Sequence, residues 1–484
     1  MVFSSPQFLF VFLPIAFFGY FALNKLRLLS VGKFWLVAMS LVFYSYWSIY
    51  YLPLLGGSIL FNFLVGRLLG KQAKNRLFLA FGIVVNLSLL AYFKYANFFV
   101  ENISWVLDEN FAIGAIALPL GISFFTFTQI AYLVDSYSES AREYDIINYA
   151  LFVTFFPHLI AGPILHHREM MSQFKSSDTL PINYKNILMG LFFFSVGMFK
   201  KVAIADTFAT WANAGYGSTG DLQFFAAWAT SLSYTFQLYF DFSGYCDMAI
   251  GAALLFNIWL PINFNSPYKA LDIQDFWRRW HITLSRFLRD YLYIPLGGNR
   301  ASGARVSFNL FATFVLGGLW HGASWMFILW GALHGAALII HRFWHRAGLS
   351  LPSPVAWIVT FFFVNVTWVF FRAPTMDHAA RVLRGMVDLG SANLPVPDIP
   401  TAALAWGGHI SDLLLRVWPS GMVTQGPCFA AIIAAFALIS LKNSQQLALN
   451  GIGTIKTIYA AALMCLASYL MLETTSSVFL YFNF

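Results

Sequence analysis

The feature that most constrains this chain is the stretch 306–340, which contains no Asp, Glu, Lys or Arg. As one straight α-helix it would reach about 50 Å, whereas the hydrocarbon core of a bilayer is about 30 Å thick. Such a segment must bend, tilt strongly or re-enter the membrane. Its glycine-rich part, LGGLWHGASW at 316–325, is the expected break, because glycine interrupts a helix and lets helices approach closely.

Shorter apolar runs recur along the rest of the chain. Hydrophobic residues make up 59% of the sequence and charged residues only 10%, far from the usage of soluble domains. We therefore expect an all-α polytopic membrane protein with about 11 to 14 membrane helices, built as one membrane domain over 1–484. The expected spans are 8–23, 34–50, 52–66, 77–93, 111–134, 146–165, 187–205, 222–240, 244–262, 308–340, 355–371, 402–417, 426–441 and 455–471.

Basic residues near the first spans predict the orientation. One group follows the first run and a second follows two runs later, and neither contains an acidic residue; the residues are Lys25, Arg27 and Lys33, then Arg67, Lys71, Lys74 and Arg76. Because such residues stay on the cytoplasmic side, the N-terminus is predicted to be periplasmic. No basic residue precedes the first run, so we expect no cleaved signal peptide. The net charge of +8 fits an anionic lipid surface, and no nucleic-acid partner is expected.

The block 269–305 is cationic, with seven basic residues against three acidic ones. On a helix, its aromatic residues and leucines share one face and the arginines lie opposite; the face is Phe276, Trp277, Trp280, Leu284, Phe287, Leu288 and Tyr291. This pattern predicts a helix that lies in the membrane interface or packs its aromatic face on the bundle. The arginines could anchor lipid phosphates or bind a phosphorylated substrate, because a guanidinium matches phosphate oxygens. The candidates are Arg278, Arg279, Arg286 and Arg289.

Three histidines are candidates for chemistry. His321 lies at the expected break, and an ionisable side chain at membrane depth is costly enough to suggest a cavity or a relay. A hydrogen-bonded structural histidine is the alternative. His334, in WGALHG, could share a face with His321 only if the helix ran unbroken, and His281 follows Trp280 at the edge of the aromatic face.

Other site classes are not expected. Adjacent histidines on a helix point about 100° apart, so the cluster 166–169 (HHRE) is predicted to be a helix end and no metal site. Cys246, Cys428 and Cys465 show no CxxC spacing and predict no disulfide framework. Nucleotide-binding, HExxH and GxSxG motifs do not occur in a suitable context.

Two motifs carry a resemblance. DFWRRWHITLSRFLRDYLYIPLGGNR at 275–300 and GLWHGASWMFILWGALHG at 318–335 resemble the membrane-bound O-acyltransferase family, in particular its bacterial branch with the alginate O-acetyltransferase membrane subunit. The opening MVFSSPQFLFVFLPI and the closing FLYFNF also resemble that branch. The similarity extends over essentially the whole chain.

The resemblance implies a ring or funnel of helices with the catalytic histidine at its thin centre. His321 matches the family's catalytic histidine, and His281 matches a second site that holds His or Asn and has a supporting role. Trp280, Trp320 and His334 are expected to line the tunnel to His321. Bacterial members of this branch are thought to take an acetyl group from a cytoplasmic donor, acetyl-CoA, and to pass it across the inner membrane to periplasmic acetyltransferases.

The function implied is O-acetylation of an exported polysaccharide, with alginate as the first candidate and no bound cofactor. We expect His321 to act as a general base on the acceptor hydroxyl, or as a nucleophile through an acyl-histidine. The alternatives are O-acetylation of peptidoglycan or cellulose, D-alanylation of teichoic acids, and acylation of a lipid. A transporter or flippase that makes and breaks no bonds is the alternative of another class.

Overall fold

The computed structural model describes residues 1–71, 75–109, 111, 113–114, 116–138, 145–392, 426–449, 451–473 and 479–480. Over these residues all regular secondary structure is helical, which confirms the all-α prediction. The predicted span 402–417 lies outside the described residues. Contacts divide the chain into two compact units, Met1–Phe194 with Tyr245–Ile262, and Ser195–Gly244 with Asn263–Phe484. The expectation of one domain stays a prediction.

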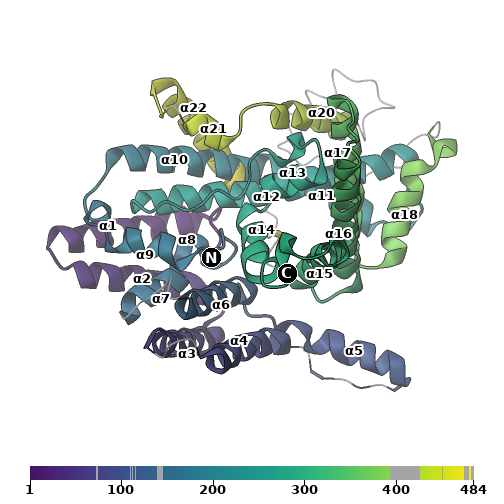
Figure 1. The fold of residues 1–484 in the computed structure, drawn as a ribbon. Coiled ribbons are helices and arrows are strands. Elements are labelled where there is room, and N and C mark those ends of the chain that lie inside the picture. The colour runs from purple at the N-terminus through teal and green to yellow at the C-terminus, as the bar shows by residue number, and fades with distance from the viewer. Residues whose placement is uncertain are drawn as a thin grey trace. The chain divides into compact units, whose positions relative to one another are not determined.

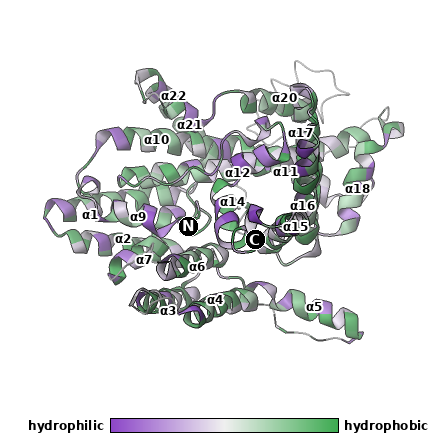
Figure 2. Ribbon diagram, viewed as in Figure 1, coloured by the Kyte–Doolittle hydropathy of each residue, from purple (hydrophilic) through white to green (hydrophobic). Residues whose placement is uncertain are grey.

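Seven helical segments of the described chain are long and apolar enough to cross a membrane, which confirms a multi-pass membrane protein (Figure 2). Two further apolar helices are shorter. Because other helices are short or interrupted, the total of 11 to 14 stays a prediction. The segments are Phe8–Lys25, Ile49–Gly70, Arg76–Leu107, Tyr184–Gly217, Trp325–Arg346, Ser353–Arg372 and Thr454–Glu473, with Leu29–Ser45 and Pro427–Ser440 as the shorter ones.

The first unit is a helical bundle with an aromatic core. Its rings include Phe12, Phe43 and Phe156, whose centroids lie 5.1–5.8 Å apart. Helix α1 packs on α2, and α6 packs on α3 and α4 (Figure 1). The helices are α1 (Leu13–Lys25), α2 (Leu29–Ser45), α3 (Leu52–Lys71), α4 (Arg76–Leu90), α5 (Ala96–Leu107), α6 (Ile122–Tyr137), α7 (Ile146–Thr154), α8 (Phe156–Leu159) and α9 (His167–Lys175), with most of α10 (Tyr184–Phe199).

The second unit holds all the sequence-predicted site residues. Helix α16 packs along α15 and also contacts α17 and α13 (Figure 1). The helices are α11 (Asp206–Gly217), α13 (Ile273–Arg279), α14 (Ile282–Leu288), α15 (Gly303–His321), α16 (Trp325–Arg346), α17 (Ser353–Arg372), α18 (Met376–Val387), α20 (Gly426–Ser440), α21 (Ser444–Ala448) and α22 (Thr454–Glu473), with most of α12 (Phe224–Leu255).

The uncharged stretch forms two helices, as its length and glycines predict. Helix α15 ends at His321, and α16 begins at Trp325, capped by the Ser324 hydroxyl, which accepts a hydrogen bond from the Met326 N–H at 3.2 Å. The break therefore falls inside 316–325, and the prediction of a break there is confirmed. The expectation of one span over 308–340 is wrong, because the chain turns back on itself at this point.

Glycines let the two helices of this hairpin touch through their backbones. A Cβ atom on Gly318 would overlap the carbonyl oxygen of Phe327, and one on Gly331 would overlap the carbonyl oxygen of Phe314. Small residues at a membrane helix contact permit this approach. The end of α15, where His321 lies, is therefore fixed against α16 by main-chain contact.

The cationic block does not form one helix, so that prediction is wrong. It breaks at Trp280 and His281 into α13 and α14, and His281 has a left-handed backbone with φ of 44°. The preceding loop pairs with the break: the Ile282 N–H donates to the Asn263 carbonyl at 3.0 Å, and the Asn265 N–H donates to the Arg279 carbonyl at 2.9 Å. These hydrogen bonds satisfy backbone groups that the interruption leaves without helical partners.

The aromatic face of the block is buried. Phe276, Trp280 and Leu284 are each 1% exposed. Of the two placements that the sequence allows, the structure shows the one in which the aromatic face packs on other helices. An exposed helix lying flat in the membrane interface is not what α13 and α14 form.

Candidate active site

His321 is buried in an aromatic cage at the end of α15. Its ring centroid lies 5.0 Å from that of Trp320, 5.2 Å from that of Trp330 in α16 and 5.2 Å from that of Phe371 in α17. The imidazole is 3% exposed. Apolar walls of this kind exclude water and strengthen electrostatic interactions inside them.

His281 is the second histidine of the site. The centroid of its ring lies 6.5 Å from that of His321, and Phe242 of α12 packs against it at 4.8 Å. Complete burial lowers the pKa of the His281 imidazole to about 3, so the ring is neutral at pH 7. The structure thus brings together two of the three histidines that the sequence singled out, His281 and His321, each at a helix interruption.

His334 has a packing role in the structure. The Trp277 Nε1–H donates to its Nδ1 at 3.1 Å, so in the neutral ring Nε2 carries the hydrogen and donates to the Thr367 hydroxyl at 3.1 Å. Thr367 in turn donates to the Val364 carbonyl at 2.8 Å. This fully buried chain of hydrogen bonds joins α13, α16 and α17.

A cavity of about 780 Å³ lies beside α13, α14, α15 and α16, and its charged lining is basic. None of the described residues that line it is an Asp or a Glu. The charge comes from five arginines, which are Arg278, Arg286, Arg289, Arg342 and Arg346, and His341 and His345 also line the cavity. Arg289 also pairs with Asp290 at 2.7 Å, and His341 lies 3.7 Å from Asp272.

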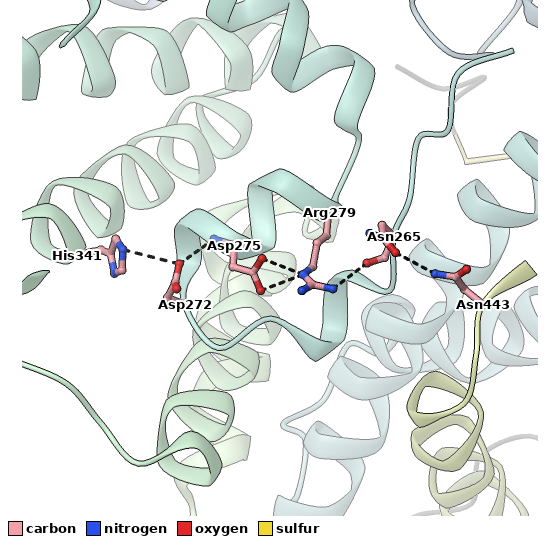
Figure 3. A network of polar contacts seen from close by, with 6 residues as sticks. All are labelled: Asn265, Asp272, Asp275, Arg279, His341 and Asn443. Carbon is pink, nitrogen blue, oxygen red and sulfur yellow. Dashed lines mark hydrogen bonds and ion pairs between the residues drawn. The ribbon is translucent and has the colours of Figure 1, made fainter. Parts of the chain in front are cut away.

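Arg279 does not share this cavity, which corrects its grouping with the other three arginines. Its Nε donates to both oxygens of Asp275 at 2.9 Å, and its Nη1 donates to the Asn265 carbonyl at 3.4 Å (Figure 3). The same network continues from Asn265 to Asn443 and from Asp275 through Asp272 to His341. Adjacent residues on a helix point about 100° apart, so Arg278 and Arg279 face different neighbours.

Sequence reasoning missed the basic residues at the end of α16. They belong to the segment HRFWHR at 341–346, directly after the uncharged stretch. Residues four apart on a helix share a face, so Arg342 with Arg346 and His341 with His345 form two rows. That spacing is a signal the sequence contained. Their convergence on Arg278 and Arg286 could not be predicted, because it depends on how α13, α14 and α16 pack.

Two tryptophan rings in sequence connect the cavity to His321. Trp277 lines the cavity, and its ring centroid lies 5.8 Å from that of Trp330, which is in turn 5.2 Å from that of His321. Trp280 and Trp320 are buried and are not among the residues that line this cavity. Trp280 packs on Trp368 at 4.9 Å.

The histidine cluster at 166–169 lies at a helix end. His166 is the N-cap residue of α9, and His167 is buried against the rings of Tyr132 and Phe152. In the described parts of the chain, no group of three or more His, Cys, Asp or Glu side chains is arranged to hold a metal ion.

The sequence matches the model of the membrane-bound O-acyltransferase family over residues 69–373. The chain belongs to this family. It is accordingly an enzyme, an acyltransferase, and the matched residues include both histidines, Asn263 and the whole lining of the cavity. The family resemblance of the motifs at 275–300 and 318–335 is confirmed.

Relatives extend the match over the whole chain. It is 47% identical to a peptidoglycan O-acetyltransferase of Helicobacter pylori, with 100% of this chain and 98% of the relative covered. It is 42% identical to a probable alginate O-acetylase AlgI of Pseudomonas aeruginosa, over 84% of this chain and 80% of the relative. The AlgI of Azotobacter vinelandii is 40% identical, with 100% of both chains covered.

Proposed function

We propose that this acyltransferase takes an acetyl group from acetyl-CoA and passes it across the bacterial inner membrane for O-acetylation of an exported polysaccharide. The observation that carries the proposal is the arginine-lined cavity that Trp277 and Trp330 connect to His321. The names of the relatives, which describe O-acetylation of two exported polysaccharides, support the acetyl group and the class of acceptor.

The cavity suits a donor that combines phosphates with an uncharged arm. Coenzyme A carries a pyrophosphate and a 3′-phosphate, and arginine forks bind phosphate oxygens in pairs. The remaining lining includes apolar residues such as Leu288, Leu310 and Phe314, which suit the pantetheine arm. A thioester at the end of that arm would approach His321 past Trp277 and Trp330.

His321 is proposed as the general base. It would take the proton of the acceptor hydroxyl while that oxygen attacks the thioester carbonyl, and the proton would pass to the departing thiolate. In the other route, His321 Nε2 or Nδ1 attacks first and carries the acetyl group. Acetyl label trapped on His321 without an acceptor would select the second route.

The distribution of cations supports the orientation of the chain. The cavity gathers five arginines, two of them at the end of α16, and basic residues are retained on the cytoplasmic side. The donor would thus enter from the cytoplasm. The basic loops after the first spans support a periplasmic N-terminus, and periplasmic acetyltransferase proteins would receive the acetyl group on that side.

Peptidoglycan precedes alginate as the proposed acceptor, because identity to the peptidoglycan enzyme is higher over a longer alignment. Deletion of the gene should lower ester-linked acetate in purified peptidoglycan, while a copy carrying His321→Gln should not restore it. Acetate lost from an exopolysaccharide instead would make alginate or cellulose the acceptor. Loss of alanine esters would point to teichoic acid, and unchanged acetate in both polymers would contradict the proposal.

Replacing single cavity arginines should weaken donor binding. Arg286→Gln and Arg342→Gln are each expected to raise the KM for acetyl-CoA about 10-fold or more, because each removes a charge-assisted bond of about 1.5–3 kcal/mol. Steady-state kinetics of purified protein in lipid nanodiscs measures this. The kcat should change less than KM. The phosphates are far from the thioester, so their contacts stabilise the bound donor and the transition state equally.

Arg279→Gln is the matched control for these variants. Its guanidinium is held by Asp275 and Asn265 outside the cavity, so the KM should stay within about twofold of wild type, as for a partly exposed ion pair. Acetyl-pantetheine, which lacks the phosphates, should be a poor donor for wild type. Its kcat/KM should fall little further in Arg342→Gln, because it has no phosphate for that arginine to bind. Equal KM effects in all three arginine variants would refute the phosphate assignment.

A further inference from the structure

Asn263 is a buried side chain whose amide oxygen accepts three contacts. The Thr283 backbone N–H donates to Oδ1 at 3.1 Å and the Thr283 hydroxyl donates to it at 3.0 Å. The third contact is the His281 Nδ1 at 3.2 Å. All three atoms belong to the start of α14, where His281 is the N-cap and Thr283 the second helical residue.

The Thr283 N–H fixes which end of the amide faces this break. A backbone N–H can only donate, so the atom that receives it must be the oxygen of Asn263 and cannot be its NH₂ group. The oxygen has no hydrogen to give. Nδ1 of His281 must therefore carry the hydrogen of the contact with Asn263 and donate it.

A neutral imidazole has one N–H and one lone pair. With the hydrogen on Nδ1, the lone pair of His281 is on Nε2, on the side of the ring that points away from Asn263. Its partner histidine His321 has its ring at 6.5 Å, and the neighbouring walls are Phe242 and Trp320.

We propose that Asn263 is a positioning residue that holds His281 as the Nδ1–H tautomer and thereby makes Nε2 the hydrogen-bond acceptor of the active site. His281 then supports the reaction by accepting a hydrogen bond from an acceptor hydroxyl or from protonated His321, and it moves no proton itself. This role rests on the proposed function for its kinetic consequences. The tautomer itself can be observed without any substrate.

The described ionisable groups around His281 include a second histidine and two ion pairs. His321 is the titratable side chain whose ring faces it across the site. Asp241 precedes Phe242 on α12 and is paired with the buried Lys201 at 2.9 Å, and Arg279 precedes the break on α13 and is paired with Asp275. A new charge at position 263 would lie next to the His281 imidazole, because Asn263 Oδ1 is 3.2 Å from its Nδ1.

The first test is the tautomer. Solid-state ¹⁵N NMR of the full-length protein, labelled at histidine and reconstituted in lipid, distinguishes a protonated Nδ1 from a protonated Nε2. Subtracting the spectrum of His281→Asn identifies the signals of His281. We expect protonated Nδ1 in wild type and a mixture of tautomers in Asn263→Leu. Protonated Nε2 in wild type would overturn the proposal.

The second test is kinetic and uses the conservative variant. Asn263→Leu should lower kcat about 10- to 100-fold with little change in the KM of the donor, as for other partners that orient a functional histidine. Asn263→Asp keeps the accepting oxygen and should restore most of the lost kcat at pH 8. Its carboxylate should raise the pKa of His281 by about 1–3 units and add an acid limb to kcat near pH 4–6.

Thr283→Val is the control, because it removes one hydroxyl contact from Asn263 and leaves the contact with His281 in place. It should keep the wild-type pH profile. Leu and Asp variants that lose kcat equally, with the wild-type pH profile, would show that position 263 acts only in folding and would refute the positioning role. If no variant or wild-type protein consumes acetyl-CoA while the Nδ1–H tautomer is observed, the proposed function fails and the positioning of His281 stands.

Discussion

Purified His321→Gln is expected to fold like wild type and to lose acetyl transfer by a factor of about 10²–10⁴, the usual contribution of a positioned general base. Glutamine has a similar length and can hydrogen-bond, but it cannot take a proton at neutral pH. The side chain is enclosed by Trp320, Trp330 and Phe371, so a smaller residue would leave a cavity as well. Consumption of the acetyl-CoA thioester in nanodiscs measures the loss.

The same variant separates an enzyme from a transporter. A protein that only moved an acylated carrier would bind it without breaking the thioester, so its transport would not depend on a base at position 321. His378→Ala, in the first turn of α18, is a control that removes a histidine that is not one of the cage residues and that contacts the Thr375 hydroxyl at 2.7 Å. Wild-type thioester consumption by His321→Gln would contradict the assignment of His321. If His321→Gln gives no monodisperse protein, the variant has a folding defect. The same measurement would then be made on His321→Asn.

The second large effect is expected from Gly331→Ala in α16. Its new Cβ would overlap the Phe314 carbonyl oxygen of α15, and a backbone atom cannot move aside as a flexible side chain can. Overpacking in tight cores costs about 1–3 kcal/mol even when side chains adjust. We expect a lower thermal unfolding midpoint and loss of activity together, because the shift would carry the end of α15 and His321 away from Trp330.

Gly56→Ala in α3 is the matched control, since nothing lies within 4 Å of a Cβ at that position. Alanine favours a helix over glycine by about 1 kcal/mol, so this variant should be as stable as wild type or slightly more so. Thermal melts of both variants in the same detergent make the comparison. A stable and active Gly331→Ala would show that the contact between α15 and α16 can open without harm.

The sequence predicted those features that depend on local pattern. The lack of charge over 306–340 and the glycines of 316–325 were sufficient to place the break after α15, and His321 within it. The aromatic face of the cationic block was also identified from the sequence, although its packing on other helices was only one of two placements left open. Both inferences need only the length of a helix, the thickness of a bilayer and the direction of side chains.

Features that depend on packing were not predicted. The break at Trp280 and His281 is stabilised by the loop at Asn263, which lies outside the block in sequence and shows no helical pattern. Similarly, Arg278 and Arg279 are neighbours in sequence, yet one lines the cavity and the other joins the network with Asp275. The helical periodicity of the sequence does not show which partner each of the two arginines contacts, because that depends on how the helices pack together.

The left-handed backbone of His281 restricts which mutations are informative there. At φ of 44° most side chains are strained, whereas Asn, Asp and His adopt this conformation several times more often than other residues. The family resemblance assigns either His or Asn to this site, and both residues adopt the left-handed backbone conformation more readily than most others. An alanine scan at 281 would mix the cost of the backbone with the loss of the imidazole. Asn is the substitution that separates geometry from chemistry at this position.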